Sequence, residues 1–249
     1  MDRNDQDTQD RYAGIADWYD ATFGGYRDGP SARAIRDMLG PGHGMCLDLG
    51  CGGGLHFDEE LSTGRTVIGT DLSGDQLRVA ARRGCPLVQA DAARLPFRSG
   101  SLDTVASTFT HTDLPDFAGA LGEAARVLGP GGVLVYVGTH PCFVNYAAER
   151  GTSEVIVGEG YSEAGWRGDS PVFRPEGLRS RVDELHLPLG EFLMAFIDCG
   201  LHLTEVREMS GGFGSGLTSS APALPGLIAV AAVKGCYAPG SPSNREGSR

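Results

Sequence analysis

A glycine-rich turn followed by acidic residues at strand ends could bind a ligand that carries a ribose. The segment MCLDLGCGGG, residues 45–54, is an apolar run with Asp48 inside it, and it ends in the turn Gly50–Gly54. Glycine adopts positive φ readily and lets a ligand approach the backbone without a Cβ in the way. The residues that follow, LHFDEEL, can begin a helix whose free N–H groups face the same ligand.

Asp71 lies 17 residues after Gly54, at the end of the next apolar run. An acid in this place can accept hydrogen bonds from both hydroxyls of a ribose. The alternative is a residue that only starts the turn into the next helix, but Ser73 with Gln76 already fits the cap of that helix. The turn lacks the G-x-G-x-x-G spacing of dinucleotide sites because residue 55 is Leu.

Alternating strand and helix patterns predict the fold that positions these residues. An aromatic-rich helical stripe over 10–23 and a helix over 31–39 come first. Strands are predicted over 45–50, 65–70, 86–90, 102–108, 133–138, 201–207 and 227–233. Helices are predicted over 55–62, 74–83, 114–128 and 189–199. We expect an α/β fold with a doubly wound, Rossmann-like, seven-stranded, mostly parallel sheet, helices on both faces and the last strand antiparallel.

In such a sheet the ligand lies beyond the carboxyl ends of the strands, beside the first strand. The turn 50–54, Asp71, Asp91 and residues 108–113 all fall at that edge. Asp113 is predicted as the N-cap of helix 114–128. The segment 140–186 is less regular, and we expect one helix in it near 143–150.

Composition narrows the classes of partner. The chain has 249 residues, 21 basic and 32 acidic, with a net charge of −11, which disfavours a nucleic acid and favours a small-molecule substrate. The single lysine, Lys234, rules out a GxxxxGK[ST] phosphate loop and a tyrosine–lysine pair. The six cysteines form no CxxC pair or Cys/His cluster, so we expect free thiols and no metal site.

The N-terminal residues have neither the basic nor the apolar region of a signal peptide, and no apolar run is long enough to span a membrane. We therefore expect a cytoplasmic protein with no membrane partner, either a monomer or a homodimer. Heavy use of arginine and glycine is typical of GC-rich bacterial genomes, which suggests a role in bacterial specialised metabolism.

Several motifs of this chain, in their order along the sequence, resemble those of the class I S-adenosylmethionine-dependent methyltransferases. The resemblance is to the small-molecule type of this family, which includes ubiquinone-biosynthesis-like enzymes. LDLGCGGG is similar to the first motif of that family, and the acid of GTDLS to its ribose-binding position. DAARLPF, LDTVASTFTHTDLPD and EAARVLGPGGVLVYVG are similar to later motifs. The resemblance covers about residues 40–140 and implies S-adenosylmethionine as cofactor.

The resemblance also implies roles for particular residues. Asp48 would lie near the methionine amino group, and Gly50, Cys51 and Gly52 would let the backbone approach the methionine and ribose. Asp71 would hold the ribose hydroxyls. The remaining cofactor contacts would come from Leu72 and Ala92 around the adenine, Asp91 at its amino group, and Thr108 and Phe109 at the methionine end.

Methyl transfer from a sulfonium needs alignment of the acceptor and exclusion of water, and a base only if the acceptor starts protonated. His111 and His140, after the fourth and fifth predicted strands, are the candidates. The alternatives are a cofactor contact or a local turn for His111 and a turn residue for His140.

The acceptor pocket is expected to involve the two segments that flank the core. In similar enzymes the N-terminal region, here residues 1–40, covers the cofactor as a lid, and an insertion, here 141–186, contributes to the acceptor pocket. The core would be 41–140 and 187–237, with a flexible tail at 238–249. Candidate acceptor contacts are Tyr12, Tyr19, Tyr26, Trp166 and Phe173, although simple packing would also explain the tyrosines.

The functional hypothesis is methyl transfer from S-adenosylmethionine to an O, N or C atom of a small metabolite by in-line displacement. Two alternatives remain open on the sequence: a nicotinamide-dependent oxidoreductase, and a catalytically silent module that binds the cofactor.

Overall fold

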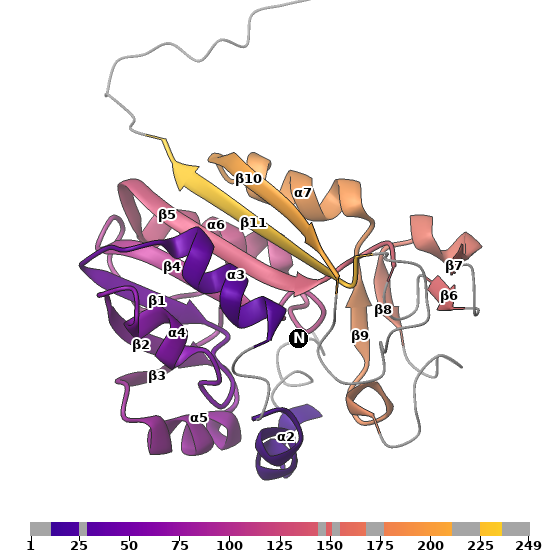
Figure 1. Cartoon of the computed structure of the whole chain (residues 1–249), viewed down its shortest axis with the longest axis horizontal. Helices are drawn as coiled ribbons and strands as arrows, with labels where there is room; N and C mark the ends of the chain where they lie inside the picture. Colours follow the sequence, from indigo (N-terminus) through magenta and orange to yellow (C-terminus); the bar gives the residue numbers. More distant parts are fainter. Residues whose placement is uncertain are drawn as a thin grey trace, which may run out of the picture.

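The computed structural model describes residues 11–24, 29–143, 148–150, 155–167, 177–210 and 225–235. A central seven-stranded sheet has the order β10-β11-β5-β4-β1-β2-β3 (Figure 1). Its strands, in chain order, are β1 Met45–Leu49, β2 Thr66–Asp71, β3 Leu87–Gln89, β4 Leu102–Thr108, β5 Leu128–Thr139, β10 Leu201–Met209 and β11 Leu227–Lys234.

The strand directions agree with the predicted sheet. The pairs β1–β2, β1–β4, β2–β3 and β4–β5 are parallel. The last strand, β11, is antiparallel to both of its neighbours, β5 and β10. The doubly wound, mostly parallel fold expected from the alternation is therefore confirmed.

Helices cover both faces of the sheet. The helices of the described chain are α2 Ala16–Phe23, α3 Pro30–Leu39, α4 Phe57–Leu61, α5 Gly74–Ala80, α6 Phe117–Val127 and α7 Leu189–Asp198, and the 3-10 turn η1 Ala81–Arg83 extends α5. Along β5, Leu134 and Tyr136 pack in the core with α6 and α7, while Val135 and Val137 pack with α3. This alternation follows from the two-residue period of a strand.

The position of β1 explains where a ligand can bind. Its residues 46–49 are all buried, as expected for a strand covered on both faces. β1 lies between β2 and β4, so the chain runs outward from β1 in one direction and later returns to its other side. The crevice at the carboxyl end of such a switch point is the usual ligand site of open α/β sheets.

Three local predictions were wrong. Helix α6 begins at Phe117 and not at 114, because Asp116 accepts the Gly119 N–H at 2.8 Å and acts as the N-cap in place of Asp113. Strand β5 begins at Leu128, ahead of the Pro130–Gly132 break, because Leu128 already pairs with Leu102. A helix was expected near 143–150, but its last three residues, Ala148–Arg150, form strand β6 instead. Residues 144–147 lie outside the described residues.

The segment after β5 holds short strands instead. Strand β6 pairs antiparallel with β7 Val155–Val157, and β8 Gly165–Arg167 pairs antiparallel with β9 Glu184–His186. Two 3-10 turns, η3 Glu159–Ser162 and η4 Leu178–Ser180, complete it. Within the described ranges, no helix has the length and apolar character needed to cross a membrane. The predicted division of the chain into lid, core, insertion and tail remains a prediction.

Candidate functional site

The glycine turn leaves the carboxyl end of β1 in a conformation that requires glycine. Gly50, Gly52 and Gly54 have φ values of 70°, 51° and 76°, where residues with a Cβ are strained. A Cβ on Gly50 would also lie 2.4 Å from Cγ2 of Thr110, in the loop after β4. The turn can therefore lie directly against that loop only because residue 50 is glycine.

Asp71 fixes this turn from the neighbouring strand. Its Oδ2 accepts the backbone N–H of Gly52 and its Oδ1 accepts that of Ser73, both at 2.8 Å. Burial raises the pKa of Asp71, while these two N–H groups act in the opposite direction. An ionised carboxylate offers about four acceptor positions. Two hydrogen bonds therefore leave it able to accept further donors from a ligand.

A pocket opens at this edge of the sheet, and most of the predicted cofactor residues line it. Those that do are Gly50, Cys51, Gly52, Asp71, Leu72, Asp91, Ala92, Thr108 and Phe109. Phe109 has a φ of 56°, a left-handed conformation that is uncommon for a residue with a side chain. Such backbone strain is concentrated at functional sites.

Asp48 is buried in β1 and does not line the pocket. The side chain is 1% exposed, and its Oδ1 has no hydrogen-bond partner among the described residues. Burial, together with the nearby charge of Asp71, raises the pKa of Asp48 to about 8. Both effects favour the protonated form, and since Asp48 does not line the pocket, a direct ion pair with a ligand is not what its position offers.

His111 is part of the hydrophobic core. Its Nδ1 shares a hydrogen bond with the hydroxyl of Tyr136, and its ring packs 5.2 Å from that of Phe192 and 6.0 Å from that of Phe117, centroid to centroid. Burial lowers the pKa of His111 to about 3. Since His111 does not line the pocket, this position gives no support to its predicted role as a base.

His140 is also buried, and both of its ring nitrogens are engaged by the chain. Nε2 lies 2.8 Å from Oε1 of Glu208, and Nδ1 accepts the backbone N–H of Cys142 at 3.1 Å. Burial lowers the pKa of His140, and the carboxylate of Glu208 opposes that shift. Like His111, this residue does not line the pocket, and the geometry gives its predicted role as a base no support.

The predicted acceptor contacts are placed differently from one another. Tyr12 and Tyr19, just before and within α2, line the pocket, and their ring centroids are 6.1 Å apart. Trp166 does not line it, and its ring lies 3.9 Å beneath the guanidinium of Arg11. Tyr26 and Phe173 lie outside the described residues.

An ion pair that was not predicted from the sequence lies beside the pocket. Asp113 lines the pocket and accepts a hydrogen bond from Nη1 of Arg179 at 2.7 Å, and Arg179 also donates to Oγ1 of Thr112 at 2.6 Å. Burial and the charge of Asp113, which hydrogen-bonds Tyr12, raise the pKa of the Tyr12 hydroxyl. Three separate segments therefore meet at Asp113. Its place in the loop after β4 was the only signal in the sequence.

Comparisons with known proteins agree with this arrangement. Residues 47–136 match the family model described as a methyltransferase domain. The chain is 35% identical over 139 residues to the demethylmenaquinone methyltransferase of Mycolicibacterium paratuberculosis, covering 54% of this chain and 60% of that protein. The corresponding protein of Corynebacterium urealyticum is 36% identical over 96 residues, which is 39% of this chain and 41% of the relative. The chain thus spans about 60% or less of the length of these curated relatives.

Solved structures show the same fold. An S-adenosylmethionine-dependent methyltransferase from Mesorhizobium loti superposes with a TM-score of 0.64 at 22% identity, covering 83% of this chain and 99% of that one. The geranyl diphosphate C-methyltransferase of Streptomyces coelicolor gives a TM-score of 0.58 at 16% identity, covering 83% and 79%.

The fold is that of the class I S-adenosylmethionine-dependent methyltransferases. Residues 47–136, which match the methyltransferase-domain model, hold the glycine turn, Asp71 and the loop after β4.

Proposed function

We propose that this protein transfers a methyl group from S-adenosylmethionine to a small-molecule acceptor. The observation that carries the proposal is the pair formed by Gly52 and Asp71, which lies in the pocket wall and keeps acceptor positions on the carboxylate. The matched domain family and the curated relatives support it. When bound, S-adenosylmethionine supplies a methyl group already activated by the sulfonium.

The residues of the pocket fit this cofactor. Asp71 would accept the ribose hydroxyls, and Leu72 and Ala92 would supply apolar contact to the adenine. The carboxylate of Asp91 accepts the Ala93 N–H at 2.9 Å and remains partly exposed, so it can still accept the adenine amino group. Thr108 and Phe109, at the end of β4, would contact the methionine end.

The protein would contribute to catalysis by aligning the acceptor with the methyl group and excluding water, more than by transferring a proton. The acceptor atom must lie about 3–3.5 Å from the methyl carbon, in line with the bond that breaks. Tyr12 and Tyr19 line the pocket from the α2 side, and excluding water there would protect the reaction. Because His111 and His140 do not line the pocket, we propose that neither acts as a base and that the acceptor either needs none or enters the pocket already deprotonated.

For the acceptor, we propose an electron-rich ring of the quinol type as the first class to test. The support is that the curated relatives matched over residues of the core are named demethylmenaquinone methyltransferases. Aromatic side chains at the pocket, Tyr12 and Tyr19, are suited to contact such a ring. Residues of the segment 141–186 would complete the acceptor site.

The test is turnover with S-adenosylmethionine labelled in its methyl group. The panel would hold reduced demethylmenaquinone, simple phenols, amines and carboxylic acids, and the readout would be labelled product together with S-adenosylhomocysteine by mass spectrometry. Product from the quinol supports the full proposal, whereas product from another member keeps the reaction and changes the acceptor. Tight cofactor binding without any turnover would favour the silent module. Oxidation or reduction of a nicotinamide would favour an oxidoreductase.

A further inference from the structure

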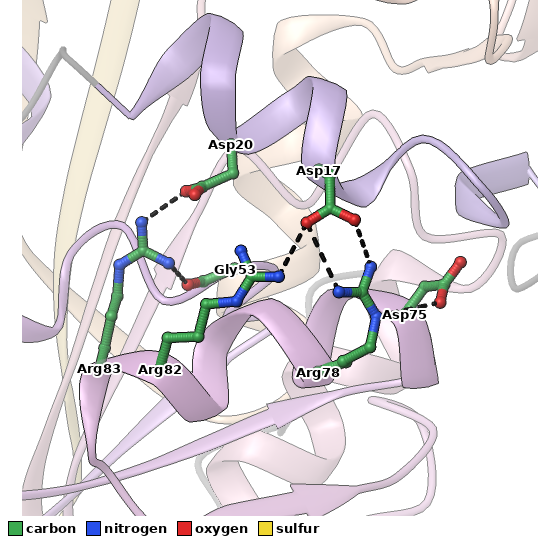
Figure 2. A network of polar contacts seen from close by, with 7 residues as sticks. All are labelled: Asp17, Asp20, Gly53, Asp75, Arg78, Arg82 and Arg83. Atoms are coloured by element: carbon green, nitrogen blue, oxygen red, sulfur yellow. Dashed lines mark hydrogen bonds and ion pairs between the residues drawn. The ribbon is translucent and has the colours of Figure 1, made fainter.

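Helix α2 is attached to the α5–η1 segment by complementary charges. Asp17 and Asp20 are three residues apart, so they lie on one face of α2. The facing segment presents Arg78, Arg82 and Arg83 (Figure 2). Asp17 pairs with Nη2 of Arg78 at 2.7 Å and with Nη2 of Arg82 at 3.0 Å.

Arg83 differs from the other two arginines because it has two kinds of partner. Its Nη2 donates to the carboxylate of Asp20, and its Nη1 donates to the backbone carbonyl of Gly53 (Figure 2). Gly53 is part of the glycine turn and lines the pocket. One planar guanidinium, whose donors point in fixed directions, therefore connects the helix to the turn.

The contact of Arg83 with Asp20 and Gly53, here called the bridge, is less exposed to solvent than the ion pairs that Asp17 forms with Arg78 and Arg82. The side chains of Asp17, Arg78 and Arg82 are 60%, 47% and 57% exposed, whereas those of Arg83 and Asp20 are 15% and 26% exposed. Exposed ion pairs contribute little and are screened by salt, while partly buried ones are screened less. The bridge through Arg83 is therefore the contact in this network best able to hold the helix.

Another part of the same region faces the pocket. Tyr12 and Tyr19 line the pocket, and the backbone N–H of Gly14 donates to Oδ2 of Asp75 in α5 at 2.7 Å. The α2 region thus lies between the pocket and the charged face of α5–η1. The charged contacts hold the side of this region that faces α5–η1, while Asp113 hydrogen-bonds Tyr12 on the pocket side.

We propose that Arg83 is a positioning residue that couples the docking of α2 to the conformation of the glycine turn, so that cofactor and product are retained while the helix is docked. This inference rests on the proposed function for the identity of the ligand. The coupling itself is a property of the ligand-free chain. Neither Arg83 nor Asp20 touches the reacting atoms, and both act through the turn and the helix.

The first experiment measures hydrogen exchange of the amides in residues 11–24 in the ligand-free protein. Arg83→Gln and Asp20→Asn each cut the bridge, and we expect exchange in this segment to accelerate about tenfold in both. The double variant should match Arg83→Gln and not show the product of two effects, because both substitutions break one contact. Unchanged exchange in both single variants would overturn the proposal.

The second experiment measures the dissociation rate of S-adenosylhomocysteine by stopped flow. Arg83→Gln should release it about tenfold faster. Asp20→Asn, which keeps the contact to Gly53, should have a smaller effect. Arg83→Lys keeps the positive charge but lacks the two-pronged guanidinium that contacts both Asp20 and Gly53. Compared with Arg83→Gln, it should therefore recover slow amide exchange in residues 11–24 more fully than slow release of S-adenosylhomocysteine. Equal product release in wild type and Arg83→Gln would contradict the coupling.

Arg207→Gln is the matched control, because Arg207 pairs with Glu205 in the edge strand β10 and with Asp37 in α3, and it does not line the pocket. It should leave both readouts unchanged. If wild-type protein bound no S-adenosylhomocysteine, the proposed function would fail, while the exchange experiment would still decide whether Arg83 holds the helix.

Discussion

Asp71 accepts the backbone N–H of Gly52 at 2.8 Å, which joins the end of β2 to the glycine turn after β1. The same carboxylate accepts the N–H of Ser73, the N-cap of α5. One side chain thereby fixes the turn, the strand end and the entry to a helix relative to one another. A ligand that binds Asp71 would find the glycine backbone already in place.

Asp48 should make folding stability depend on pH. Its pKa is raised from 3.8 to about 8 by burial and by Asp71, so the folded state binds more protons than the unfolded state between these pH values. The contribution of Asp48 to stability must then fall as pH rises from about 4 to about 8. Asp48→Asn removes this dependence, so the variant should gain stability relative to wild type as pH rises over that range.

Urea denaturation at a series of pH values measures the effect. Asp198→Asn, which removes an exposed carboxylate at the end of α7, controls for the change in net charge. A difference between Asp48→Asn and wild type that stayed constant with pH would show that Asp48 is already ionised in the folded protein.

His111 should matter for stability and not for the pH dependence of activity. His111→Phe leaves the buried hydroxyl of Tyr136 without its partner, at a cost of about 1–3 kcal/mol. The double variant with Tyr136→Phe should recover much of this loss, because both polar groups are then absent. Since burial lowers the pKa of His111 to about 3, the pH–rate profile between pH 5 and 9 should keep its shape. Loss of an ionisation near neutral pH from that profile would instead restore His111 as a base.

Arg179 should be more important than an ordinary surface arginine. Its side chain is 13% exposed and that of its partner Asp113 is 19% exposed, so Arg179→Met leaves a largely buried carboxylate without its counter-charge. We expect a loss of about 3 kcal/mol in the free energy of unfolding. Arg179 also lies 3.6 Å from the buried carboxylate of Glu184. Replacing all three residues, as Arg179→Met with Asp113→Leu and Glu184→Gln, should therefore cost less than the single change.

Arg207→Met provides the comparison for Arg179, because its ion pair with Glu205 is more exposed and should contribute less than about 1 kcal/mol. Similar losses for Arg179→Met and Arg207→Met in urea denaturation would mean that the Asp113 pair is no stronger than a surface pair.

The strands and the glycine turn could be predicted because their signals are local. The apolar run that ends at Gly50 and the acid at the end of β2 place the pocket wall without any knowledge of distant contacts. Asp113 could not be placed in the same way. Asp113 and Asp116 both precede the apolar face of α6, and the choice between them as cap depends on a backbone conformation that the sequence does not specify.

The position of His111 and the pairing of Arg179 with Asp113 could not be predicted either, because their partners lie far away in the sequence. His111 is enclosed by Tyr136, Phe117 and Phe192, which come from three different elements, and Arg179 reaches Asp113 across 66 residues. A histidine after a strand looks the same in sequence whether it faces the pocket or the core. Only the packing of α6 and α7 on the sheet decides which.

Calorimetric titration with S-adenosylhomocysteine tests the central claim most directly. Wild-type protein should bind it, and Asp71→Asn should weaken binding by about 2 kcal/mol, close to 30-fold, because a charged acceptor of the ribose hydroxyls is lost. Asp198→Asn, with the same change in net charge at a distant helix end, should bind like wild type. Absence of binding to the wild type, or equal affinity for wild type and Asp71→Asn, would contradict the assignment of this pocket to S-adenosylmethionine.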